Sequence, residues 1–142
     1  WKRPANWQGE CHQAWFAGVH SNVGGSYSPD GLANEALHWI VEKAEALGLE
    51  FDKDYLAHFW PCFNSVLNDS MTMAYRVMGP FERQIGTHVD DGEMLHQSAV
   101  DRMRLGKCNY HPDNLKGYPE RFRDLPVVNT SRIERGKPSP DL

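Results

Sequence analysis

The sequence has few cysteines and no excess of positive charge, and each shortage excludes a class of protein. Its three cysteines, Cys11, Cys62 and Cys108, are widely spaced and odd in number. They form neither a disulfide framework nor a C-x-x-C zinc motif, so we expect reduced thiols. Fifteen basic and nineteen acidic side chains leave a net charge of −4. Because nucleic-acid binding depends on clustered Lys and Arg, we expect no nucleic-acid partner.

Long apolar runs and metal-binding motifs are also missing. No run approaches the ~18 apolar residues that a transmembrane helix needs. No H-E-x-x-H motif occurs, and Cys11 and His12 would point to opposite faces of a strand, so we expect neither a metal nor another cofactor. The chain starts with WKRPANW, without a methionine or an apolar signal segment. This start favours a piece of a longer protein.

What is present is an α/β pattern near the N-terminus, in a chain long enough for one domain. Residues 11–19 are rich in aromatic and apolar side chains, which predicts a buried strand. Residues 21–31 have the composition of a loop. A helix follows, capped by Ser28 or by Asp30, and Gly48 is placed to end it. One apolar stripe runs along this predicted helix: Leu32, Ala33, Ala36, Leu37, Ile40, Val41, Ala44 and Leu47.

The rest of the chain has weaker signals. Residues 52–60 favour a short helix before Pro61, residues 65–79 an irregular segment, and residues 92–106 another short helix. Five prolines after residue 106 predict irregular chain. With one convincing strand, the sequence predicts an α/β fold whose sheet is incomplete.

His20 is the leading candidate for chemistry. It follows the predicted strand directly, and ligands of open α/β sheets bind beyond the carboxyl ends of strands. An imidazole can take a proton near pH 7 and return it to a leaving group. Gly24 and Gly25 would let backbone approach a ligand or a neighbouring loop. The alternative is an ordinary turn that contains a histidine.

Other polar and aromatic groups have simpler interpretations. Asp90, Asp91 and Glu93 are interpreted as a solvated acidic turn, and His38 as a surface or boundary histidine. His96 is assigned a structural or interface role. An aromatic cluster is interpreted as core, with a lipid-facing lid as the alternative: Tyr55, Phe59, Trp60 and Phe63.

Two stretches, WFAGVHSNVGGSY and LANEALHWIVEKAEALGL, resemble the second half of an α/β-hydrolase family related to type VI secretion phospholipase effectors. The stretches YRVMGPFERQIG, HQSAVDRM and YHPDNL are similar to later parts of the family, so the resemblance covers roughly residues 12–115. Asn22 stands where the family usually has aspartate, and Ser26 replaces a third glycine. The positions that match the two family motifs are Trp15, Phe16, Gly18, His20, Gly24, Gly25, Tyr27, Ala36, Leu37 and Trp39.

The resemblance implies a serine hydrolase acting on lipid esters, with His20 as the triad histidine. Asn22, Gly24 and Gly25 would shape the substrate loop. Chain order in such enzymes is serine, acid, histidine, and no Gly-x-Ser-x-Gly occurs here. Residues 1–115 would therefore be the C-terminal portion of the catalytic domain, inactive alone, and residues 116–142 a Pro-rich tail.

The family also implies a biological setting. An effector of this kind is made in the cytoplasm and secreted, acts on a lipid or ester substrate, and meets a secretion or immunity partner. The alternative function is a non-catalytic module that binds another protein or a lipid surface.

Overall fold

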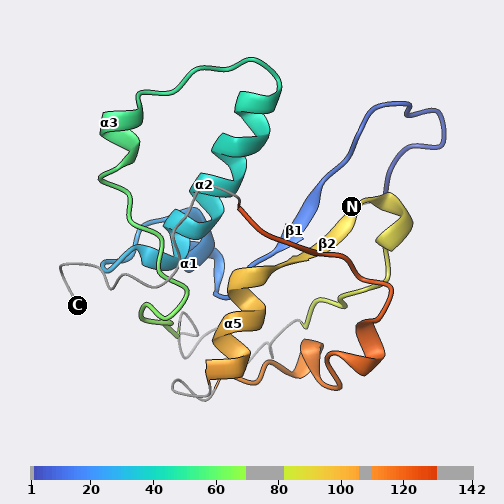
Figure 1. The fold of residues 1–142 in the computed structure, drawn as a ribbon. Helices are drawn as coiled ribbons and strands as arrows, with labels where there is room; N and C mark the ends of the chain where they lie inside the picture. The colour runs from blue at the N-terminus through green and yellow to red at the C-terminus, as the bar shows by residue number, and fades with distance from the viewer. Residues whose placement is uncertain (1, 70–81, 106–109, 131–142) are drawn as a thin grey trace, which may run out of the picture. The chain divides into compact units, whose positions relative to one another are not determined.

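The computed structural model describes residues 2–69, 82–105 and 110–130. It divides the chain into two compact units. The first comprises Trp1–Trp15 and Ser70–Val128, and the second comprises Phe16–Asp69 and Asn129–Leu142. Figure 1 shows the elements of each unit along the chain.

The first unit contains a parallel sheet of three short strands. These are β1 (Gln13–Trp15), β2 (Glu93–His96) and β3 (Val127–Val128), in the order β1-β2-β3. Gln13 pairs with Glu93 on one side of β2, and Leu95 pairs with Val127 on the other. All four residues of β2 are buried, as expected for the central strand of a parallel sheet.

This sheet corrects two predictions. The strand predicted at residues 11–19 is confined to three half-buried residues, and the helix predicted at residues 92–106 is a strand followed by a helix. Short apolar runs such as Met94-Leu95 suit either structure, and here the hydrogen bonds of both neighbouring strands decide for a strand. Those neighbours are far away in sequence, so no local pattern indicated them.

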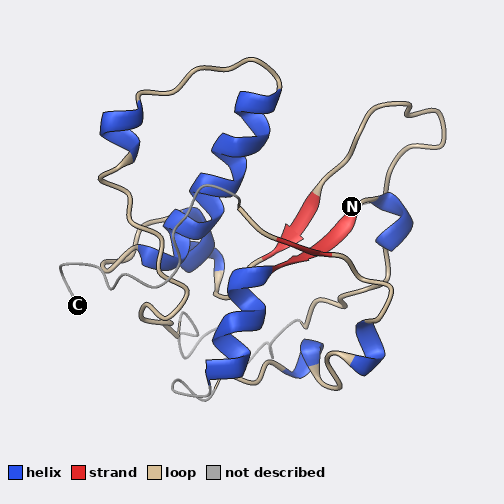
Figure 2. Cartoon of the chain, viewed as in Figure 1, coloured by secondary structure: helices blue, strands red, loops and turns tan. Residues whose placement is uncertain are grey.

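Helix α5 (Gln97–Leu105) continues directly from β2, as Figure 2 shows. Residues 110–130 are less irregular than predicted, because they contain two 3-10 turns, η2 (Asp113–Leu115) and η3 (Glu120–Phe122), and strand β3. The rest of the segment predicted to be irregular, residues 106–109 and 131–142, lies outside the described residues. Both turns contribute a buried residue. The apolar core of this unit consists of Ile85, Met94, Leu95, Ala99, Val100, Leu115, Phe122 and Leu125.

The second unit is built from helices α1 (His20–Gly24), α2 (Gly31–Ala46) and α3 (Lys53–Leu56). Helix α1 packs against α2, near its N-terminal end (Figure 1). The helix predicted before Pro61 is present as α3, in a shorter form. Of the segment predicted to be irregular, residues 65–69 form no helix or strand and residues 70–79 lie outside the described residues.

Both ends of α2 can be compared with the prediction. The later start is observed, with Asp30 at the N-cap, although its side chain makes no capping hydrogen bond. At the other end, Gly48 N–H donates to the Glu45 carbonyl at 2.9 Å and Leu49 N–H donates to the Ala44 carbonyl at 3.1 Å. These two bonds form a Schellman motif, so the prediction that Gly48 ends the helix is confirmed.

The apolar stripe of α2 is only partly buried. Leu32, Ala36 and Val41 are buried, whereas Ile40 is 57% exposed and Leu47 is 86% exposed. Asn34 and Glu35 are buried instead, which the stripe did not predict. The apolar stripe is therefore exposed to solvent at Ile40 and Leu47. Among the described residues, no helix has the length and hydrophobicity required to cross a bilayer.

Candidate functional site

His20 is the first residue of α1 and is exposed. Four residues separate it along the chain from the end of β1. Val19 is the N-cap, and its carbonyl accepts hydrogen bonds from Asn22 N–H at 3.0 Å and Val23 N–H at 3.1 Å. A helical turn that starts at His20 therefore stands where the sequence predicted a loop.

The two glycines after His20 differ in what their positions require. Gly25 has φ = +85°, a conformation that disfavours side chains. Gly24 ends α1, and a Cβ added there would meet no atom within 4 Å. Gly24 lies about one helical turn after His20, so the space beside Gly24 is on the same side of α1 as His20. Ser26 also has a positive φ, of 119°, although it is not a glycine.

Asn22 faces the interior and is 3% exposed. Its Nδ2 donates to the Val66 carbonyl at 3.3 Å, and its Oδ1 accepts from Asn68 N–H at 3.3 Å. The side chain therefore uses both its donor and its acceptor to join α1 to the segment at residues 66–68.

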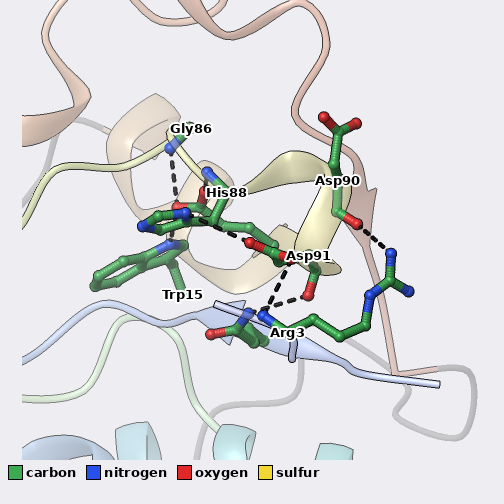
Figure 3. Close-up of polar contacts among 8 residues, drawn as sticks. Arg3, Trp15, Gly86, His88, Asp90 and Asp91 are labelled. Carbon is green, nitrogen blue, oxygen red and sulfur yellow. Dashed lines mark hydrogen bonds and ion pairs between the residues drawn. The ribbon is translucent and has the colours of Figure 1, made fainter. Parts of the chain in front are cut away.

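A second polar centre lies in the first unit, around Glu93, and Figure 3 labels the residues that donate to it, Trp15, Gly86 and His88. Glu93 is 3% exposed. Its Oε1 accepts from Trp15 Nε1 at 2.7 Å and from Gly86 N–H at 2.9 Å, and its Oε2 accepts from His88 N–H at 2.6 Å. The interpretation of Glu93 as part of a solvated turn is therefore wrong. Three donors compensate the loss of hydration of this carboxylate.

Asp91 extends this centre toward the N-terminal segment (Figure 3). Its Oδ1 accepts from Arg3 N–H at 3.1 Å, and its Oδ2 lies 3.6 Å from His88 Nδ1. The Arg3 guanidinium donates to the Asp90 carbonyl at 2.9 Å. The described residues contain no group of three or more His, Cys, Asp or Glu side chains that could hold a metal ion. The Glu93 centre is therefore a hydrogen-bonded junction between β1, β2 and the turn at residues 86–91.

No sequence signal singled out Glu93 from its acidic neighbours. The one sequence feature that could have indicated its burial is that it directly precedes the apolar pair Met94-Leu95. The donors that enclose it come from β1 and from the preceding turn, so their convergence depends on the pairing of β1 with β2.

Residues 1–43 match the family described as "T6SS, Phospholipase effector Tle1-like, catalytic domain". The match links this part of the chain to type VI secretion phospholipase effectors. It includes all four site residues predicted from the sequence, His20, Asn22, Gly24 and Gly25. No curated protein and no solved structure matches the chain. The wider resemblance over residues 44–115 stays a prediction.

Two other histidines, His38 and His96, make internal contacts. His38 Nε2 lies 2.7 Å from the Phe59 carbonyl oxygen, which suits the predicted boundary position. His96 is fully buried, and its Nδ1 accepts from the backbone N–H of Ser98 at 3.3 Å. Ser98 Oγ lies 2.7 Å from the same nitrogen and therefore donates its hydroxyl proton. The ring thus connects the end of β2 to the first turn of α5.

The aromatic cluster is less buried than a core. Tyr55 is 64% exposed and Trp60 is 38% exposed, so the interpretation as core is wrong for these two residues. Phe59 is half-buried and packs edge-on against Tyr55, with ring centroids 5.3 Å apart. The lipid-facing alternative stays a prediction. Cys11 and Cys62 are free thiols, and Cys108 lies outside the described residues.

Proposed function

We propose that this chain supplies the triad histidine, His20, of a serine phospholipase of the Tle1-like effector type. The observation that carries the proposal is the family match across residues 1–43, which includes the segment around His20. The exposure of His20 at the start of α1 supports it, because a general base must reach the substrate.

In this mechanism the neutral His20 imidazole accepts the proton of the serine hydroxyl as its oxygen attacks the ester carbonyl. The imidazolium then protonates the departing alcohol, and the same cycle with water releases the fatty acid. General acid–base catalysis of this kind contributes about 10²–10⁴-fold in rate. Gly24 and Gly25 would leave room for the substrate beside the imidazole.

The nucleophile would come from chain outside these 142 residues. No Gly-x-Ser-x-Gly is present, and triad histidines of α/β-hydrolases follow the serine and the acid in chain order. Residues 1–115 would thus form the C-terminal portion of an α/β-hydrolase-like domain, to which the short parallel sheet and its helices contribute. As an effector, the protein would be secreted and would act on a lipid ester.

Exposed apolar side chains favour a second candidate, a binding module. Leu47, Leu49 and Tyr55 are all more than half exposed in the segment from the end of α2 to α3. Such a surface suits contact with another protein or a lipid surface.

The decisive experiment measures phospholipid hydrolysis by the product of the full reading frame. Its sequence should contain a Gly-x-Ser-x-Gly before residue 1, and its turnover of phosphatidylcholine vesicles should be sensitive to fluorophosphonates. His20→Ala should lower kcat by about 10⁴-fold. His12→Ala is the matched control, because His12 is an exposed histidine whose partner, Glu10, is also exposed, and it should leave turnover unchanged.

Two outcomes contradict the proposal. One is near-normal turnover of the His20→Ala enzyme. The other is fluorophosphonate-sensitive ester hydrolysis by residues 1–142 alone, which would require a nucleophile within them.

A further inference from the structure

His20 and Asn22 lie on opposite sides of α1. At 3.6 residues per turn, two residues that are two positions apart point roughly 200° apart around the helix axis. The structure agrees, because His20 is exposed and Asn22 is 3% exposed. The side that α1 buries therefore determines where the imidazole points.

We propose that Asn22 is a positioning residue that fixes the orientation of His20. Its carboxamide bonds to the Val66 carbonyl and to Asn68 N–H, which prevents α1 from rotating about its axis. The significance of this role for catalysis rests on the proposed function. The orientation itself can be measured without any turnover.

Close packing at Gly18 reinforces the two hydrogen bonds that Asn22 makes to Val66 and Asn68. A Cβ added to Gly18 would lie 2.5 Å from the Asn22 Cβ. The Asn22 side chain is thus confined between the backbone of Gly18 and the segment at residues 66–68. Helix α1 has only five residues and little stability of its own, so its setting depends on such tertiary contacts.

Where the related family usually has aspartate, this chain has an amide, and the two hydrogen bonds of Asn22 use both of its polar atoms. One atom must donate to the Val66 carbonyl and the other must accept from Asn68 N–H. An aspartate carboxylate has only acceptors, so one of its oxygens would face the Val66 carbonyl oxygen. Asn22→Asp is therefore nearly isosteric, yet it removes one of the two bonds and buries a charge.

The test uses nuclear magnetic resonance on residues 1–142, with the His20 ring signal assigned by its loss in His20→Ala. In the unmodified chain the Asn68 amide proton should be protected from exchange. Asn22→Ala should speed that exchange by about tenfold or more and move the His20 ring signal toward that of a free histidine. Asn22→Asp should keep the Asn68 protection and still move the His20 signal.

Asn34→Ala is the matched control. Asn34 lies in the same unit, is also 3% exposed, and donates through Nδ2 to the Trp60 carbonyl at 3.1 Å. Its loss should lower the melting temperature by an amount similar to that for Asn22→Ala, while the His20 ring signal stays in place. A general loss of stability is thereby separated from a change of orientation.

The proposal is overturned if Asn22→Ala and Asn34→Ala have the same effect on the His20 signal. It is also overturned if Asn22→Asp matches the unmodified chain, and this variant decides the matter should Asn22→Ala not fold. These outcomes concern only the orientation of His20. A catalytic role for His20 is refuted separately, by near-normal turnover of the His20→Ala enzyme.

Discussion

The two polar centres described above, at Glu93 and at Asn22, differ in the charge of the buried side chain and in the length of its hydrogen bonds. Glu93 is a buried carboxylate enclosed by three donors at 2.6–2.9 Å, whereas Asn22 is a buried neutral amide with two bonds of 3.3 Å. Hydrogen bonds to a charged group are shorter and stronger than those between neutral groups. We infer that the first centre contributes mainly to stability and the second mainly to orientation.

This comparison predicts a hierarchy of mutational effects, with the largest at Gly92, beside Glu93. A Cβ at residue 92 would lie 1.8 Å from the Cys11 carbonyl oxygen, and φ there is +85°. Gly92→Ala should therefore push β1 away from β2 and reduce the free energy of unfolding by about 4 kcal/mol. Urea denaturation followed by circular dichroism measures this change. A loss under 1 kcal/mol would show that the two strands can separate without penalty.

Removal of the carboxylate should have the next largest effect. Glu93→Ala leaves the indole of Trp15 and two backbone N–H groups without their acceptor, so we expect a loss of about 3 kcal/mol. Glu93→Gln keeps the shape but directs an NH₂ group at a donor, and should cost about 2 kcal/mol.

Asp90→Ala serves as the control in the same denaturation experiment. Asp90 is exposed, and it takes part in the Arg3 contact through its backbone carbonyl. Its substitution should change the free energy of unfolding by less than about 0.5 kcal/mol. Equal effects of Glu93→Ala and Asp90→Ala would remove the distinction between a buried junction and a solvated turn.

Asn22→Ala should cost less than Glu93→Ala, about 1.5 kcal/mol, because both lost bonds are neutral and long. Thermal melting of the two variants side by side measures the difference. If Asn22→Ala is the more destabilising change, Asn22 is a stability residue of the same kind as Glu93, and the contrast between the centres fails.

The smallest expected effect concerns Tyr110, in the same unit as Glu93. Burial raises the pKa of its phenol above 10.0, and the Arg102 guanidinium, 5.6 Å from the ring centroid, opposes this rise. Above pH 10 the unfolded chain therefore loses this proton before the folded chain does. Stability should fall with rising pH from there until the folded phenol also ionises.

Tyr110→Phe tests this assignment, because the variant has no phenol to ionise. Its stability curve from pH 9 to pH 11 should decline less steeply than that of the unmodified chain. Parallel curves would mean that other groups cause the alkaline loss of stability.

Local signals predicted α2 well and the sheet poorly. The end of α2 before Gly48 follows from turn chemistry between residues adjacent in sequence, and Asp30 precedes its first residue as expected, although without a side-chain capping hydrogen bond. Strand β2 was missed because its partners, Gln13–Trp15 and Val127–Val128, lie far from it along the chain. Short strands carry too few residues for their periodicity to distinguish them from a helix.

At the candidate site, the sequence by itself determined the residue types: a histidine, an amide two positions later and a pair of glycines, in a motif that resembles the phospholipase effector family. Only the tertiary structure decided that Asn22 is buried and His20 exposed. It also decided that Glu93 is buried and Asp90 exposed. The physical reason is that the type of each residue is given at its own position, whereas its burial depends on residues distant in sequence. Asn22 is hydrogen-bonded to Val66, and Glu93 is hydrogen-bonded to Trp15.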